Sequence, residues 1–123
     1  MQPIKVKLHK NSKTVELQYS TSSYQLSFEL LRVLSPSAEV RGHGVGQEVL
    51  QVGKSNVMIV GVEPIGHYAL RFDFDDGHNS GIYSWQYLYK LATEQDQLWS
   101  QYLQQLEQAG QSRIADSINF KSI

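Results

Sequence analysis

The sequence contains no cysteine in its 123 residues. The absence of thiols excludes disulfide bonds, thiol catalysis and any zinc or iron–sulfur site that this chain would build from its own thiolates. The sequence also lacks an apolar run near the ~18–20 residues that a membrane-spanning helix requires. Its first ten residues alternate apolar and basic side chains, unlike the continuous apolar core of a signal peptide. We therefore expect a cytoplasmic protein with no membrane contact.

An excess of charge of one sign is missing as well. The 11 Lys and Arg residues stand against 12 Asp and Glu residues, for a formal net charge of −1. Proteins that bind nucleic acids through phosphate contacts carry a strongly basic surface, so we expect no nucleic-acid partner. The lysines near the N-terminus (Lys5, Lys7, Lys10 and Lys13) are typical of an exposed edge strand that charge protects from pairing with other chains.

The residues that are present favour one ordered domain. Apolar residues make up 41% of the chain, enough for a single core at this length. Apolar and polar residues alternate over residues 4–8, 14–19, 24–28 and 68–74, and residues 56–63 form a short apolar run. Both patterns predict strands, and the turn residues between them predict hairpins. The expected fold class is α+β, with an antiparallel β-sheet built from hairpins and with C-terminal helices.

The last third of the sequence predicts two helices. Ser84 is placed to cap a first helix, and Thr93 is placed to cap a second. The second helix carries an apolar stripe at helical spacing, formed by Trp99, Tyr102, Leu103 and Leu106. Gly110 is the residue at which we expect that helix to end. We expect residues 1–110 to form the single domain and residues 111–123 to form a loosely ordered tail.

Two segments carry the most specific pattern in the sequence, LRVLSPSAEVRGHG at residues 31–44 and FDFDDGHNSGIYSWQYL at residues 72–88. Each places polar, glycine-rich turn residues beside an apolar run. Residues 35–54 also form a long connection rich in Ser, Pro and Gly. A connection of this length in a compact domain is usually functional or faces a partner. The sequence alone does not show whether the two segments touch.

The motifs SPSAEVRGHG, VEPIGHYAL and FDDGHNSGIYSW resemble those of the gamma-butyrobetaine hydroxylase-like N-terminal domain family, in the form of its small stand-alone bacterial members. The resemblance covers residues 26–91 and implies the fold of that domain, whose function is unknown. In the hydroxylases the domain is an accessory unit, and a separate domain holds iron, 2-oxoglutarate and substrate. That catalytic domain is absent from these 123 residues. The resemblance therefore implies that the chain is not an oxygenase, and we expect no enzyme activity.

The resemblance also implies a lost zinc site. In the eukaryotic hydroxylases, a Cys-Pro-Cys-x-x-Cys run and one distant histidine hold zinc. The cysteine positions correspond to Ser35, Ser37 and Val40 of this sequence, and the histidine corresponds to His78. Structural zinc requires four strong donors, and neutral serine hydroxyls are poor ones. We therefore expect neither zinc nor any other cofactor.

The partners implied by the resemblance belong to metal-cofactor systems. The same domain is similar to a segment attached to Mrp-like P-loop ATPases that carry iron–sulfur clusters. An Mrp-like ATPase or an iron-dependent enzyme is therefore the expected kind of protein partner. The domain contributes to dimer contacts in the hydroxylases, so the chain is expected to be either a monomer or a homodimer.

Two functional hypotheses follow. In the first, the chain is a non-catalytic accessory domain that contacts a partner protein through Arg41, His43, Asp76 and His78 on one exposed face. In the second, it binds a metal or a small ligand through His43, His78 and a carboxylate of the turn at residues 73–76. Metal ligands must converge, so the distances between these side chains separate the two hypotheses.

Overall fold

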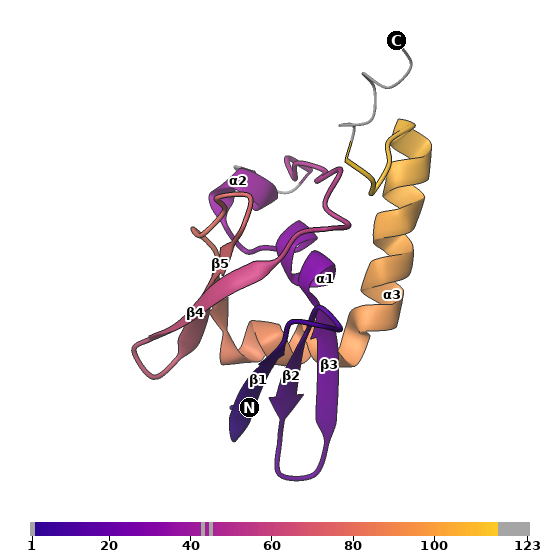
Figure 1. Ribbon diagram of the computed structural model, residues 1–123. Coiled ribbons are helices and arrows are strands. Elements are labelled where there is room, and N and C mark those ends of the chain that lie inside the picture. The colour runs from indigo at the N-terminus through magenta and orange to yellow at the C-terminus, as the bar shows by residue number, and fades with distance from the viewer. Residues whose placement is uncertain (1, 43, 45, 116–123) are drawn as a thin grey trace.

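The computed structural model describes residues 2–42, 44 and 46–115 (Figure 1). Its elements are β1 (Lys5–His9), β2 (Thr14–Gln18), β3 (Ser23–Ser27), α1 (Phe28–Val33), α2 (Ala38–Arg41), β4 (Ile59–Ile65), β5 (Ala69–Phe74), β6 (Ile82–Ser84) and α3 (Trp85–Ala109). The α+β class with antiparallel hairpins is confirmed. The strands form two three-stranded sheets, β1-β2-β3 and β4-β5-β6, where we expected one.

The N-terminal sheet has one buried and one exposed face because its sequence alternates with a period of two. Val15 and Leu26 are directly paired between β2 and β3, and both are fully buried. Lys5 and Lys7 are exposed on β1, which is an edge strand as predicted. The sheet thereby presents a polar outer face, and its aliphatic inner face joins the core.

The second sheet contributes the aromatic part of the same core. Phe72 on β5 and Tyr83 on β6 are fully buried, and their rings meet edge to face with centroids 5.0 Å apart. Strand β6 was not predicted, because its three residues are too few to show a period. Val60 has no partner on β5, so the β4 ladder contains a bulge at this exposed residue. Bulges of this kind protect an edge strand from pairing with another chain.

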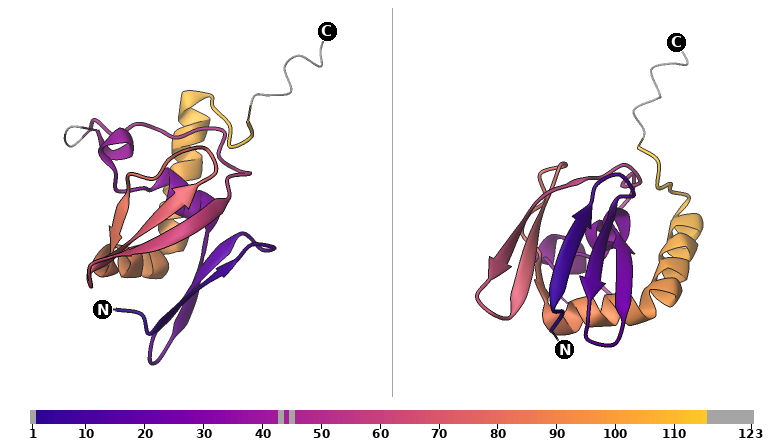
Figure 2. Two further views of the ribbon diagram at one scale, coloured as in Figure 1. Left: turned by 60° about the vertical axis from the view of Figure 1, so that its left-hand side comes forward. Right: turned by 60° about the horizontal axis from the view of Figure 1, so that its bottom comes forward.

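Helix α1 is short and lies in the middle of the molecule, with α3 curving past it (Figures 1 and 2). The Ser27 hydroxyl accepts a hydrogen bond from the Leu30 amide at 2.9 Å and caps the helix. All six residues of α1 are buried, including Glu29 and Arg32. Buried charges of this kind require partners of opposite sign, and those partners come from distant parts of the chain.

The two C-terminal helices predicted from the sequence are one helix, α3, of 25 residues. Ser84 caps it as predicted, accepting from the Tyr87 amide at 3.1 Å, and Gly110 ends it with a left-handed φ of 66°. The predicted cap at Thr93 is wrong. Its hydroxyl instead donates to the Tyr89 carbonyl oxygen at 2.9 Å, a bond that tends to bend helices. Figure 1 shows α3 changing direction part-way along its length.

The segment after α3 is attached to the domain as far as the structure describes it. The carbonyl oxygens of Ser112 and Arg113 accept from the amides of Gly53 and Ser55, each at 2.9 Å. The Arg113 guanidinium donates twice to the Glu29 carboxylate, at 2.8 and 2.7 Å. Residues 116–123, the rest of the predicted tail, lie outside the described part. Among the described residues, no helix is long and apolar enough to cross a membrane.

The helix boundary can be tested by comparing two hydroxyl deletions. Ser84→Ala removes the cap of α3 and is expected to lower the free energy of unfolding by about 1 kcal/mol. Thr93→Ala removes a hydroxyl from the helix interior and is expected to change it by less than about 0.5 kcal/mol. Urea unfolding followed by circular dichroism measures both. A larger loss for Thr93→Ala than for Ser84→Ala would contradict the single continuous helix.

Candidate functional site

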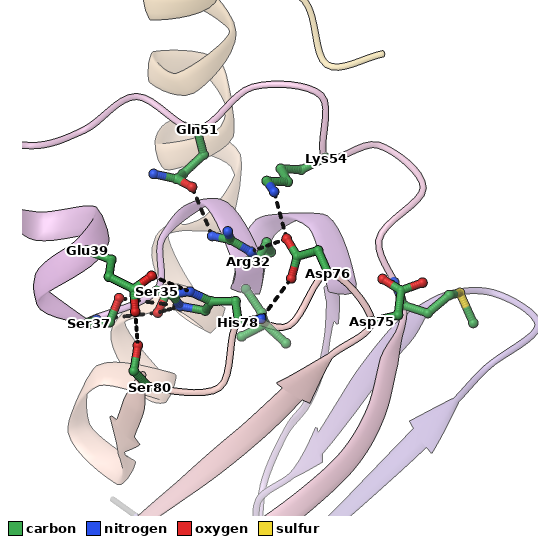
Figure 3. A network of polar contacts seen from close by, with 12 residues as sticks. Arg32, Ser35, Ser37, Glu39, Gln51, Lys54, Asp75, Asp76, His78 and Ser80 are labelled. Atoms are coloured by element: carbon green, nitrogen blue, oxygen red, sulfur yellow. Dashed lines mark hydrogen bonds and ion pairs between the residues drawn. The ribbon is translucent and has the colours of Figure 1, made fainter. Parts of the chain in front are cut away.

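The two turn-rich segments singled out in the sequence lie against each other. Gly81 packs so closely on Ser35 that an added Cβ would lie 2.3 Å from the Ser35 hydroxyl oxygen. The Ser80 hydroxyl donates to the Glu39 carboxylate at 2.7 Å. Figure 3 shows the polar network that results. Any side chain at position 81 would therefore force Ser35 to move.

Ser35, Ser37 and His78 form a buried group, which we call the serine–histidine cluster. The His78 Nε2 atom lies 2.8 Å from the Ser35 hydroxyl and 3.4 Å from the Ser37 hydroxyl. None of the three residues is more than 5% exposed. Burial lowers the pKa of His78 from its usual range, and the Arg32 guanidinium acts in the same direction. The Glu39 carboxylate, 3.8 Å from the His78 Nδ1 atom, raises the pKa, but the effects of burial and Arg32 are larger.

The chain forms this cluster at the junction of α1 and α2. Ser35 follows the last turn of α1, and Ser37 stands at the N-cap position of α2. The Ser37 hydroxyl makes no capping bond to α2. It is turned toward His78 instead (Figure 3). The short helix gives up its side-chain cap for a contact with a turn that is distant in sequence.

Ser35, Ser37 and His78 occupy three of the four positions that the family resemblance assigns to zinc. The fourth position is Val40, a buried aliphatic residue of α2 that offers no donor atom. The two serine hydroxyls already lie within hydrogen-bonding distance of the His78 Nε2 atom. One imidazole and two neutral hydroxyls do not match the four strong donors of structural zinc. The donor set does not fit that metal.

A second group, the Asp76 cluster, consists of Arg32, Gln51, Lys54 and Asp76. One carboxylate oxygen of Asp76 accepts from Arg32 at 2.8 Å and from Lys54 at 2.6 Å. Arg32 also donates to the Gln51 side chain at 3.0 Å. Burial alone would raise the pKa of Asp76, but the hydrogen bonds from Lys54 and Arg32 outweigh it and lower the pKa to about 2. The carboxylate is therefore ionised at every physiological pH.

The two clusters are linked through the β5–β6 turn. The other carboxylate oxygen of Asp76 accepts from the His78 backbone amide at 3.1 Å. The Asp76 side chain thus faces Arg32 and Lys54, whereas the His78 ring faces the serines (Figure 3). Sequence reasoning missed Arg32 and Lys54. The signal for Arg32 was its place among the apolar residues Leu30, Leu31, Val33 and Leu34, because a cation on a buried face requires a carboxylate.

The structure places the predicted binding residues in different environments. Arg41 is exposed, and its guanidinium lies over the Tyr87 ring, 5.2 Å from the centroid. Asp76 is held in ion pairs, and its side chain is 24% exposed. His78 is buried, so its predicted place on an exposed face is wrong. His43 lies outside the described residues.

The acidic turn at residues 73–76 does not gather its carboxylates toward one point. Asp73 faces Arg71, with 3.7 Å between the closest charged atoms. Asp75 accepts from the Met58 amide at 3.0 Å, and Asp76 belongs to its own cluster. Among the residues that the structure describes, no three His, Asp or Glu side chains are placed to hold a metal ion together.

Three tyrosines fix the elements around the two clusters. Tyr83 and Tyr87 donate their hydroxyls to the carbonyl oxygens of Leu31 and Leu34. These carbonyls lie at the C-terminal end of α1, where a helix leaves its acceptors without internal partners. Tyr102 donates to the Gln51 carbonyl oxygen at 2.7 Å. The tyrosines thereby join α3 and β6 to α1 and to the connection before β4.

A groove of about 820 Å³ lies beside the serine–histidine cluster. It is lined by residues of three regions: the end of α1 with α2, the segment at residues 48–51, and α3. The Val49 amide donates to the Val40 carbonyl oxygen at 2.8 Å and joins two of these regions. Sequence reasoning did not predict this groove, because its walls come from segments far apart in the chain.

The ion pairs of Asp76 predict a specific dependence of stability on pH. The folded-state pKa of Asp76 is about 2, below the usual value of 3.8 for an aspartate, so the stabilisation is present above about pH 4 and is lost as the pH falls through 2. Asp76→Asn is expected to cost about 2 kcal/mol near neutral pH, and the difference from the native chain should shrink toward pH 2. Urea unfolding of both chains across this range measures it. Asp96→Asn, at an exposed position of α3, is the control, and a pH-independent gap for Asp76→Asn would contradict the assignment.

The close approach of Gly81 to Ser35 predicts a large effect of one methyl group. Gly81→Ala is expected to lower the free energy of unfolding by about 1–3 kcal/mol, because the added carbon forces the two segments apart. Gly44→Ala is the matched control, since a Cβ there meets no atom of the described residues within 4 Å. Thermal unfolding of both variants gives the comparison. Equal stabilities would mean that the segments are not packed as described.

The comparisons with known proteins agree with this structure. The model of the family described as gamma-butyrobetaine hydroxylase-like, N-terminal, matches residues 6–89. No curated protein matches the sequence. Two proteins with solution NMR structures are similar to this chain. The first is 58% identical over 94% of this chain and 91% of its own, with a TM-score of 0.83. The second is 46% identical over 91% of this chain and 84% of its own, with a TM-score of 0.78. A crystal structure from Acidithiobacillus ferrooxidans ATCC 23270, of a DUF971 family protein with unknown function, is 36% identical over 74% of this chain and 92% of the other, with a TM-score of 0.62. The chain therefore belongs to the gamma-butyrobetaine hydroxylase-like N-terminal domain family.

Proposed function

We propose that this chain is a non-catalytic domain that binds a partner protein. The observation that carries the proposal is the internal pairing of its most polar groups. Asp76 is bound by Arg32 and Lys54, and His78 is buried against two serines. A general acid or base must reach the proton of a substrate, whereas Asp76 and His78 are each bonded to other side chains of the same chain. Their arrangement supports a structural role in which they hold the two turn-rich segments together.

The surface that these groups stabilise suits a protein partner. The connection between α2 and β4 is long, and it is tied down at Gln51 by Arg32 and at Lys54 by Asp76. Two of its aliphatic side chains nevertheless face outward, Val49 at 52% and Val52 at 40% exposed. An ordered backbone that presents apolar side chains lowers the conformational entropy lost on binding. This combination is typical of an interaction surface.

The absence of zinc is part of the same proposal. In our interpretation, the hydrogen bonds of His78 with Ser35 and Ser37 join the two segments, the role that a metal has elsewhere in the family. The alternative of a metal or small-ligand site is less well supported, because Asp76 and His78 are engaged with different partners. The partner class remains the one implied by the family resemblance, an Mrp-like ATPase with iron–sulfur clusters or an iron-dependent enzyme.

Co-purification tests the proposed interaction. The tagged full chain, expressed in its native cells, is expected to recover the same protein partner in replicate experiments. Val49→Asp places a charge on the exposed connection and should lower the recovered amount several-fold. Leu103→Asp, at a residue of α3 that is 40% exposed, is the control and should leave recovery unchanged. Repeated purification without any partner, or equal losses in both variants, would contradict the proposal.

Zinc analysis tests the role of the serine–histidine cluster. The purified native chain is expected to bind no zinc in stoichiometric amounts, because its donor set is too weak. The triple variant Ser35→Cys, Ser37→Cys, Val40→Cys, which keeps His78, is expected to bind one zinc ion and to unfold at a higher temperature with metal than without it. Tight zinc binding by the native chain would overturn this part of the proposal.

A further inference from the structure

Arg41 differs from the other arginines of this chain in having no acidic partner among the described residues. Arg32 contacts Asp76, Arg71 contacts Glu63, and Arg113 contacts Glu29. The described structure records no ion pair for Arg41, whose guanidinium lies over the face of the Tyr87 ring. An aromatic ring beside a guanidinium helps to orient it, and the N–H groups that do not face the ring can donate hydrogen bonds to a ligand. Arg41 is therefore positioned to receive an anionic group from outside.

The residues beside Arg41 in the groove indicate which chemical groups the anionic ligand must also have. Arg41 lines the groove of about 820 Å³, together with the aliphatic residues Val33, Val40, Val49 and Leu50. Val33 and Val40 belong to the packed interior, whereas Val49 is half exposed. A ligand in this groove thus meets an aliphatic wall next to a single oriented cation.

The polar atoms around the groove indicate which kind of anion it can bind. The hydroxyls of Tyr87 and Tyr102 are already donated to the backbone carbonyls of Leu34 and Gln51. The charged side chains that line the groove are Arg41 and Glu48. A phosphate or a nucleic-acid backbone requires several converging cations, and the carboxylate of Glu48 opposes a highly charged anion. One carboxylate attached to an apolar body is the chemistry that the groove fits.

We infer that the groove between α2 and α3 binds a segment of the partner protein in which aliphatic side chains flank an Asp or Glu residue. The aliphatic side chains lie against Val49 and Leu50, and the carboxylate accepts hydrogen bonds from Arg41. The inference rests on the proposed function and names the region of contact and the kind of sequence that is recognised. Charge complementarity at Arg41 selects the acidic residue, and the aliphatic wall supplies apolar area to bury.

The test uses two peptides that differ by one charge. The isotope-labelled full chain is titrated with acetyl-Ala-Leu-Glu-Leu-Leu-Ala-amide and with its Gln analogue, and backbone amide shifts are followed by NMR. The Glu peptide is expected to shift the amides of Val40, Val49 and Tyr87, and to bind roughly five-fold more tightly than the Gln peptide, as one partly desolvated ion pair allows. In Arg41→Gln the two peptides should bind equally. Arg71→Gln, on the second sheet, is the matched control and should keep the preference.

Several results would overturn the inference. Equal binding of the two peptides by the native chain, shifts confined to another face, or no shift at millimolar peptide would each do so. Self-association of the chain that Arg41→Gln abolishes would show that a second copy fills the groove. Because Arg41 is exposed, an amide spectrum unchanged away from α2 verifies that the variant is folded. Co-purification that is sensitive to Val49→Asp but insensitive to Arg41→Gln would leave the interaction function standing and reject the acidic segment.

Discussion

The arrangement of this domain depends on the neutralisation of one buried cation. Arg32 is 7% exposed on a helix whose every residue is buried, and a desolvated guanidinium without a partner would be strongly destabilising. Asp76 supplies the negative charge from the β5–β6 turn, and the same carboxylate attracts Lys54 from the connection before β4. Three segments far apart in the chain therefore converge on one ion pair. The backbone bond from His78 to Asp76 then fixes the turn that carries the imidazole.

The serine–histidine cluster joins two loops at the positions where the family resemblance implies a zinc site. Structural zinc is held by strong bonds to thiolate or imidazole donors, and buried polar atoms in general require hydrogen-bond partners. Here the hydroxyls of Ser35 and Ser37 are close enough to His78 for hydrogen bonds, and Gly81 allows the loops to approach closely. Each hydrogen bond contributes only about 1 kcal/mol, so packing and the neighbouring ion pairs must supply the rest of the stability.

The sequence predicted the features that depend on local periodicity and missed those that depend on tertiary contact. The alternation around Val15 and Phe72 predicted their strands, and Ser84 and Gly110 predicted the ends of α3. Alternation identifies the faces of a strand but not its neighbours, so the division into two sheets was not visible. Thr93 has the character of a cap, and only the continuous packing of α3 shows that the helix passes through it. The burial of His78 likewise depends on loops that are distant in sequence, so a glycine-rich turn was taken for an exposed one.

The bidentate contact between Arg113 and Glu29 bears on where the folding unit ends. Glu29 is 6% exposed inside α1, and its partner lies beyond the last residue of α3. The family match ends at residue 89, a few residues into that helix. A fragment cut at the limits of the match would leave a carboxylate stranded in an apolar interior, and it would also lose the Tyr102 support beneath the connection before β4. We therefore expect the smallest autonomous folding unit to be longer than the segment by which the family is recognised, and to extend at least to the arginine that follows the long helix.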